Sequence, residues 1–147
     1  MYRRILLTLD GSSLAEQALP NAVAQAKHFQ AELILLKVNL ITKEKPALYR
    51  EAIEKAEELV RISAIEYLER VAAGIQDSGI EVETVVIDGV SHEAIIHFAE
   101  ENAIDLIVMS SRGQSGFNRW IMGSVADRVI RGTHIPVLLI QAFKRDD

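Results

Sequence analysis

A chain of 147 residues, 49% of them hydrophobic and 25% charged, has the composition of a globular protein, and we expect one domain spanning residues 1–147. Its net charge of −5 argues against a dedicated nucleic-acid or anionic-membrane binder, and the absence of cysteine excludes disulfides, thiolate catalysis and cysteine-based zinc sites. The first apolar run is too short for a signal peptide and meets Asp10, and no segment approaches the ~20 apolar residues of a membrane span. We therefore expect a cytoplasmic protein.

Five short apolar runs alternate with longer amphipathic segments. The runs are rich in Val, Ile and Leu and mostly lack strict alternation, which predicts strands that are covered on both faces, as in a parallel sheet. In residues 81–85 apolar and polar residues do alternate, so we expect the third strand to lie near an edge. The predicted strands are Ile5–Leu9, Leu33–Val38, Val82–Ile87, Leu106–Met109 and Val137–Ile140.

The segments between the runs predict helices. Their signals, in chain order, are a capping box at Ser13–Glu16, a first-turn proline at Pro46 of a helix running to about Gln76, a helix start at Ser91, a second capping box at Ser124–Asp127 and a C-terminal stop at Gly132. This alternation predicts an α/β fold, an open five-stranded parallel sheet with right-handed crossovers and helices on both faces.

The carboxyl ends of the strands are where a ligand is expected. In an open parallel sheet, ligands bind at the point where the strand order reverses. With the order 3-2-1-4-5, Asp10 would face the loop after the fourth strand. Its carboxylate would there accept hydrogen bonds from ribose hydroxyls or bind a divalent metal that bridges phosphates. The alternative is that Asp10 only caps the helix that follows it.

The stretch from Ser110 to Ser124 is the most informative part of the sequence. It joins a buried strand to a helix, and a small-residue loop at a helix N-terminus offers N–H groups and a positive dipole end to a phosphate. Gly113 would allow close backbone approach, and Gly123 with Ser124 would offer N–H groups and a hydroxyl. Alternatively Gly113 is only a turn and Ser124 only an N-cap, which is compatible with anion binding. No Walker lysine motif is present.

Four motifs follow one another along the chain: the strand end Thr8-Leu9-Asp10 followed by Gly11-Ser12, residues 89–93, Gly113-x9-Gly123-Ser124 and the closing residues 135–140. Together they resemble the universal stress protein A family. The resemblance covers essentially the whole chain and implies a five-stranded parallel domain of the adenine nucleotide alpha hydrolase-like type. The ATP-binding branch carries Gly-x2-Gly-x9-Gly-Ser/Thr, and this chain has Ser110 at the first glycine position.

The resemblance also implies roles for individual residues. Asp10 would contact the ribose, while Arg112 would lie near the phosphates. The other implied cofactor-binding residues are Thr8, Val38 and Met109 around the adenine, Gly113, Gly123, Ser124 and Val125 at the phosphates, and also Leu9 and Ser110. The implied ligand is ATP, or else ADP or AMP, with Mg²⁺ or Mn²⁺ on the phosphates near Asp10.

These observations favour an ATP-binding regulatory or signalling module of the stress response. Because no Walker lysine would stabilise a leaving γ-phosphate, we expect any hydrolysis to be slow. Two alternatives remain open: a weak metal-dependent ATPase that uses Asp10, and a nucleotide-free protein-interaction module. We also expect a homodimer through Val137–Ile140, because this apolar sheet edge would be exposed in a monomer and the family commonly pairs it.

Overall fold

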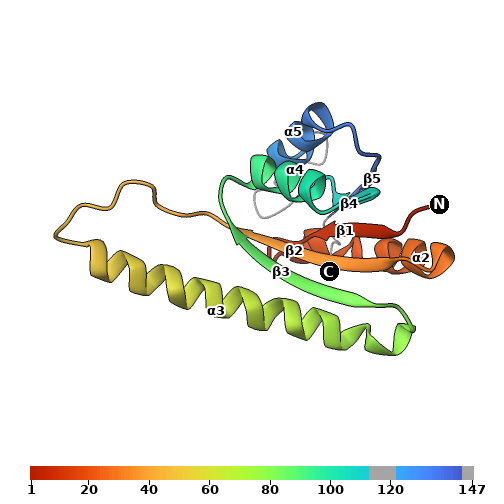
Figure 1. Cartoon of the computed structure of the whole chain (residues 1–147), viewed down its shortest axis with the longest axis horizontal. Helices are drawn as coiled ribbons and strands as arrows, with labels where there is room; N and C mark the ends of the chain where they lie inside the picture. Colours follow the sequence, from red (N-terminus) through yellow and green to blue (C-terminus); the bar gives the residue numbers. More distant parts are fainter. Residues whose placement is uncertain (113–121, 144–147) are drawn as a thin grey trace.

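The computed structural model describes residues 1–112 and 122–143 and contains one parallel sheet. The strand order is β3-β2-β1-β4-β5, as predicted, with helices on both sides of the sheet (Figure 1). Each strand begins and ends within one residue of its predicted bounds. The strands are β1 (Arg4–Thr8), β2 (Glu32–Asn39), β3 (Val82–Asp88), β4 (Leu106–Ser110) and β5 (Val137–Ile140).

The sheet separates two apolar cores, which explains the unbroken apolar runs. In β1, Ile5 and Leu7 point to one face and Leu6 to the other, and all three are fully buried. The first core packs under helices α1 (Ser13–Glu16), α2 (Leu19–Phe29) and α3 (Arg50–Gly74), and the second under α4 (Ser91–Glu101) and α5 (Ser124–Gly132). The edge strand β3 is only half-buried, in agreement with its alternating sequence.

Four predicted helix signals are wrong in detail, three of them at helix starts. Ser12, not Ser13, is the N-cap of α1, and its Oγ accepts a hydrogen bond from Ala15 N at 3.1 Å. Ser12 takes this place because Asp10 holds it in a turn. Ser124 is the first residue of α5 after an N-cap at Gly123, with no side-chain cap. Pro46 precedes α3 by four residues, because its carbonyl accepts from Tyr49 N at 2.9 Å in a separate turn.

Gly132 is not the stop that the sequence predicted but the last residue of α5. The chain leaves the helix at Thr133, which is extended. A Cβ at Gly132 would lie only 2.8 Å from Cδ1 of Ile96, so the missing side chain makes room for α4. The short 3₁₀ helix Gln76–Ser78 (η1) and Gly79, at φ 79°, end the α3 region close to the predicted stop.

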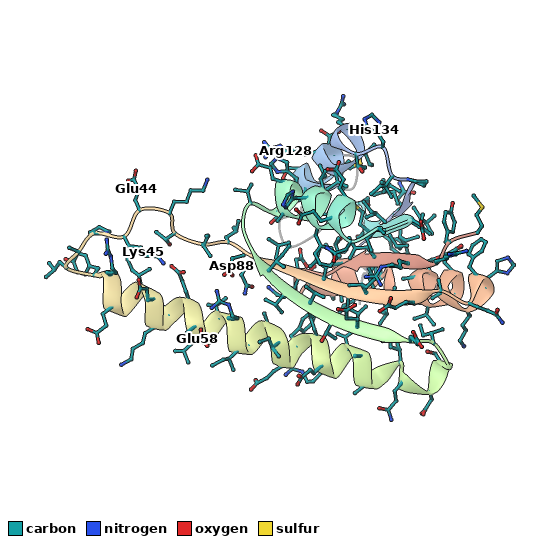
Figure 2. The ribbon with its side chains drawn as sticks, viewed as in Figure 1. Glu44, Lys45, Glu58, Asp88, Arg128 and His134 are labelled. Atoms are coloured by element: carbon teal, nitrogen blue, oxygen red, sulfur yellow. The ribbon has the colours of Figure 1, made fainter. Side chains whose placement is uncertain are left out.

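The long helix α3 and the segment before it extend past the end of the sheet (Figures 1 and 2). Lys45 Nζ lies 3.3 Å from Glu57 Oε2, which ties this segment to α3. Arg61 pairs with Asp88 at the end of β3 and with Glu58 in its own helix. Within residues 1–112 and 122–143, no helix combines the length and apolar character needed to span a bilayer.

Candidate functional site

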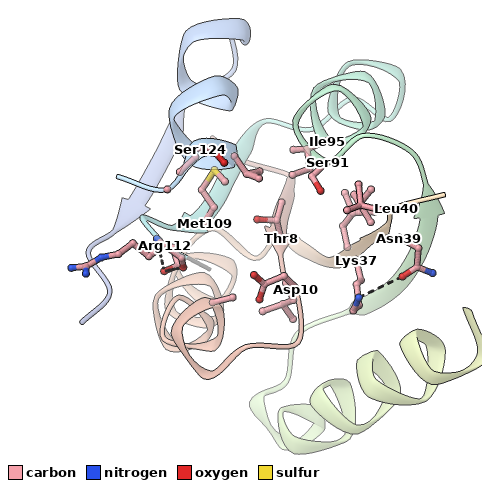
Figure 3. Close-up of a pocket in the computed structure, with 18 of the residues that line it drawn as sticks. Thr8, Asp10, Lys37, Asn39, Leu40, Ser91, Ile95, Met109, Arg112 and Ser124 are labelled. Atoms are coloured by element: carbon pink, nitrogen blue, oxygen red, sulfur yellow. Dashed lines mark hydrogen bonds between the residues drawn. The ribbon is translucent and has the colours of Figure 1, made fainter. Parts of the chain in front are cut away.

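A cavity of about 540 Å³ opens at the carboxyl ends of β1, β2 and β4, where the strand order reverses (Figure 3). This is the predicted place, and the volume suits a small-molecule ligand. Ten of the eleven predicted site residues line it, and the eleventh, Gly113, lies outside the described residues. The ten are Thr8, Leu9, Asp10, Val38, Met109, Ser110, Arg112, Gly123, Ser124 and Val125.

One wall is formed by the turn that follows β1. Leu9 N donates to Leu36 O at 2.9 Å, and the chain then turns at Gly11, whose φ of 89° favours glycine. Asp10 Oδ1 accepts from Ser12 N at 2.9 Å and from Ser12 Oγ at 2.6 Å. Asp10 therefore supports the cap of α1 through Ser12, and it does so while lining the cavity.

The opposite wall begins at the end of β4. Ser110 is buried, and its Oγ donates to Arg112 O at 2.8 Å and accepts from Arg112 N at 3.3 Å. The hydroxyl that replaces a glycine of the family motif thus closes a local turn. Arg112 contributes to the cavity wall, but its side chain runs away from Thr8 and Asp10 (Figure 3).

Ser111 holds the start of α5 beside the end of β4. Gly123 N donates to Ser111 O at 2.6 Å, while Ser111 N donates to Ile140 O at 2.8 Å. Ser111 Oγ also accepts from Ala142 N at 3.0 Å. The N-terminus of the nine-residue helix α5 therefore lies at the cavity, where Ser124 and Val125 are part of the lining. Because no side chain of the described residues caps α5, its first N–H groups are suited to an anion.

Val38 presents backbone polar groups to the space between β1 and β2. Along a parallel strand, successive residues direct their N–H and C=O groups to alternate neighbours. Leu36 O accepts from Leu9 N, just after β1, and Asn39 O accepts from Gly89 N, just after β3. The N–H and C=O of Val38 therefore point to the β1 side. The β1–β2 register ends at the pair of Thr8 and Leu36. Val38 lies past that end and lines the cavity.

Half of the twenty lining residues were not predicted. Several are apolar neighbours of predicted residues, but Lys37, Asn39, Ser91 and Ser111 are polar. Asn39 ends β2 and Ser91 begins α4, and these places were the available signal. The ten are Ala15, Leu36, Lys37, Asn39, Leu40, Val60, Ser91, Ile95, Ser111 and Ala126. Lys37 Nζ donates to Asn39 Oδ1 at 3.4 Å, and Asn39 is 5% exposed.

Among the described residues, Asp10, Lys37 and Arg112 are the charged side chains that line the cavity, while Glu16 and Tyr67 are not part of the lining. Tyr67 on α3 has a pKa raised above its usual range, first by burial, then by the Glu16 carboxylate and, less strongly, by Asp10. Asp10 is the one carboxylate among the lining residues that the structure describes. In that part of the chain, no three His, Cys, Asp or Glu side chains gather as ligands for a metal ion.

Comparisons with known proteins agree with this architecture. Residues 1–141 match the sequence model of the Universal stress protein family. Universal stress protein MJ0531 of Methanocaldococcus jannaschii is 32% identical over 146 residues, which cover 99% of this chain and 86% of the relative.

Solved structures give the same result for the fold. The structure of MJ0577, from the same organism, superposes with a TM-score of 0.87 at 28% identity and covers 99% of each chain. A universal stress protein from Archaeoglobus fulgidus, solved in complex with dAMP, superposes with a TM-score of 0.66 at 22% identity, over 95% of this chain and 98% of that chain. These neighbours have the adenine nucleotide alpha hydrolase-like fold, with the strand order found here. This chain belongs to the universal stress protein family.

Proposed function

We propose that this chain is an adenine-nucleotide-binding regulatory module of the stress response, with ATP as its ligand. The observation that carries the proposal is the cavity at the switch point, with Asp10 on one wall and the N-terminus of α5 on the other. A related protein of the same fold was solved with dAMP, which supports an adenine nucleotide as the class of ligand.

Each part of the nucleotide has a matching group in the cavity. The N–H and C=O of Val38 would pair with the edge of the adenine, and Thr8 and Met109 would contact its faces. Asp10 would accept hydrogen bonds from the ribose hydroxyls. Gly123, Ser124 and Val125 would bind the phosphates with the first N–H groups of α5 and the Ser124 hydroxyl.

A divalent metal would fit this site only as a companion of the phosphates. Asp10 is the one lining carboxylate in the described chain, so Mg²⁺ or Mn²⁺ would take most of its ligands from phosphate oxygens and water. Such an ion would neutralise phosphate charge. We propose binding, rather than turnover, as the function, and metal-dependent hydrolysis that is lost in Asp10→Ala would contradict this.

Thermal unfolding with and without ATP tests the proposal. A ligand at 100 times its Kd adds about 2.7 kcal/mol of stability, so the melting temperature should rise by roughly 8–10 °C in a chain of this length. ADP and AMP should also raise the melting temperature. GTP is the control that tests whether the effect depends on the adenine base. No rise with any adenine nucleotide at millimolar concentration would refute nucleotide binding.

Ser124→Asp tests phosphate binding separately from the stability of the fold. An acidic residue at the first position of α5 stabilises a helix N-terminus but repels phosphates. We expect the melting temperature without ligand to stay the same or rise, and the increase with ATP to disappear. Ser63→Asp adds the same charge on the exposed side of α3 and should leave the ATP effect intact.

We further propose a homodimer that forms through the open edge of β5. Ile140 O accepts a bond from Ser111 on the β4 side, so by alternation Val137 and Leu139 direct their backbone groups outward. An unpaired row of such groups is a template for a second copy of the strand. Sedimentation should show a dimer at micromolar concentration, and a monomer would contradict the pairing.

A further inference from the structure

Two donor side chains lie together at the end of β2. Lys37 and Asn39 project from the same face of the strand. The two side chains carry one acceptor atom, Asn39 Oδ1, and it accepts a hydrogen bond from Lys37 Nζ at 3.4 Å. Asn39 Nδ2 is buried and has no hydrogen-bond partner within residues 1–112 and 122–143. An ammonium has three N–H donors and an amide two. Within these two side chains, donors therefore exceed acceptors, as they do in a site for an anion.

The pair lies next to Asp10 and away from α5. A Cβ at Gly11, the residue after Asp10, would be 3.9 Å from Cε of Lys37, so the lysine stem packs against that turn. In Figure 3, Lys37 and Asp10 lie on the same side of the cavity, while Ser124 lies on the other side beyond Thr8. A cation in this position is remote from the proposed site of the 5′-phosphates and close to the proposed site of the ribose.

We infer that Lys37 and Asn39 form a second phosphate site, which selects adenine nucleotides that carry a phosphoryl group on the 2′ or 3′ oxygen of the ribose as well as at 5′. The inference rests on the proposed function, because Asp10 and α5 set the orientation of the nucleotide. Asp10 alone would repel a phosphate beside it. The Lys37 ammonium offsets that charge and donates charge-assisted hydrogen bonds, and Asn39 Nδ2 gains an acceptor.

Calorimetric titration with three probes tests the inference: AMP, adenosine 2′,5′-bisphosphate and adenosine 3′,5′-bisphosphate. At least one bisphosphate should bind about tenfold more tightly than AMP, since hydrogen bonds to charged groups are the stronger class. The preferred isomer identifies the ribose oxygen. If AMP binds as tightly as both bisphosphates, the inference is overturned and the proposed function stands. If neither ATP nor any probe binds, both fail.

Variants at the pair test whether it causes the preference. Lys37→Met keeps the stem but removes the ammonium, and should abolish the difference between bisphosphate and AMP, whereas Lys37→Arg should retain it. Asn39→Asp places a carboxylate at nearly the same shape and should shift the preference toward AMP. Lys27→Met removes the same charge from the exposed side of α2 and should keep the preference.

A different result would assign Lys37 a purely local role. If Lys37→Met lowered the affinities for AMP and for the bisphosphates by the same factor, the lysine would only balance the charge of Asp10. The inference would then be overturned. Far-ultraviolet circular dichroism of each variant establishes that it is folded. If Lys37→Met does not fold, Asn39→Asp is compared with the parent chain instead. An unchanged preference for the bisphosphate over AMP in Asn39→Asp also overturns the inference.

Discussion

Asp10 holds a turn and has a second role in our proposal, and substitution by alanine and by asparagine should separate the two. Its Oδ1 accepts two hydrogen bonds from Ser12, at 2.9 and 2.6 Å, and so holds the turn before α1. In our proposal the carboxylate also binds the ribose. Asp10→Ala removes both roles. Asp10→Asn keeps an oxygen that accepts from Ser12 but loses the negative charge that strengthens bonds from ribose hydroxyls.

The expected sizes follow from these bonds. Two hydrogen bonds of about 0.5–1.5 kcal/mol each give a loss of about 1–3 kcal/mol in the free energy of unfolding for Asp10→Ala. At about 3–4 °C per kcal/mol, the melting temperature should fall by roughly 3–12 °C. Asp10→Asn should cost under about 1 kcal/mol. Both variants should lower the affinity for ATP by about tenfold or more, because both lose the charge-assisted hydrogen bonds to the ribose.

Urea unfolding and calorimetric titration measure the two quantities on the same samples. Ser12→Ala is the matched control, because it removes the N-cap bond from Ala15 N, at 3.1 Å, and the Oγ bond to Asp10, at 2.6 Å, but keeps the Asp10 carboxylate. It should cost about 1 kcal/mol of stability and leave ATP affinity unchanged. Wild-type affinity in Asp10→Asn would refute the ribose contact. Wild-type stability in Asp10→Ala would refute the role in the turn.

Three further predictions concern the core, pH dependence and the sheet edge. Leu68→Ala, at a fully buried position of α3, should lower the free energy of unfolding by about 2–5 kcal/mol, whereas Leu59→Ala, 67% exposed on the same helix, should change it by less than about 0.5 kcal/mol; equal effects would contradict the assigned burial. Burial and Glu16 raise the pKa of Tyr67 above its unfolded value of 10.0, so the stability from this group is present below pH 10 and is lost as the pH rises through the folded pKa. Urea unfolding at pH 7 and pH 11 should therefore show a smaller loss in Tyr67→Phe than in the parent chain, and identical losses would refute this. Leu139→Pro removes an N–H that points away from β4, so sedimentation should show a folded monomer, and an intact dimer would exclude pairing through β5.

The sheet could be predicted from the sequence because burial on both faces marks the strands directly. Ile5, Leu6 and Leu7 are fully buried on alternating faces, and such runs are hard to mistake. Helix starts were less predictable, because several residues compete for one cap. Ser12 and Ser13 are equally good N-caps in sequence, and the bond from Ser12 to Asp10 decides between them. Pro46 fits a first helical turn, but a separate turn through Tyr49 takes precedence.

The candidate site was predictable where a short motif specifies it. Asp10, Gly123 and Ser124 follow strands or open a helix, and the structure brings all three to one cavity. Lys37 and Asn39 were missed for a physical reason. Whether a side chain near a strand end enters the cavity depends on which face it takes and on where the neighbouring strand stops, and the end of the β1–β2 register is a tertiary property.

Ser111 connects the wall of the cavity to the edge of the sheet. Its carbonyl holds Gly123, its N–H holds Ile140 and its hydroxyl holds Ala142, so one residue joins the start of α5 to β5. In the proposed dimer, a change at the proposed phosphate end of the cavity would reach the subunit contact through this single residue. Linkage then requires reciprocity: the factor by which ATP tightens or loosens the dimer must equal the factor by which dimerisation changes ATP affinity. Titrating ATP across a protein dilution series measures both factors, and it would show whether ATP binding changes the dimerisation equilibrium.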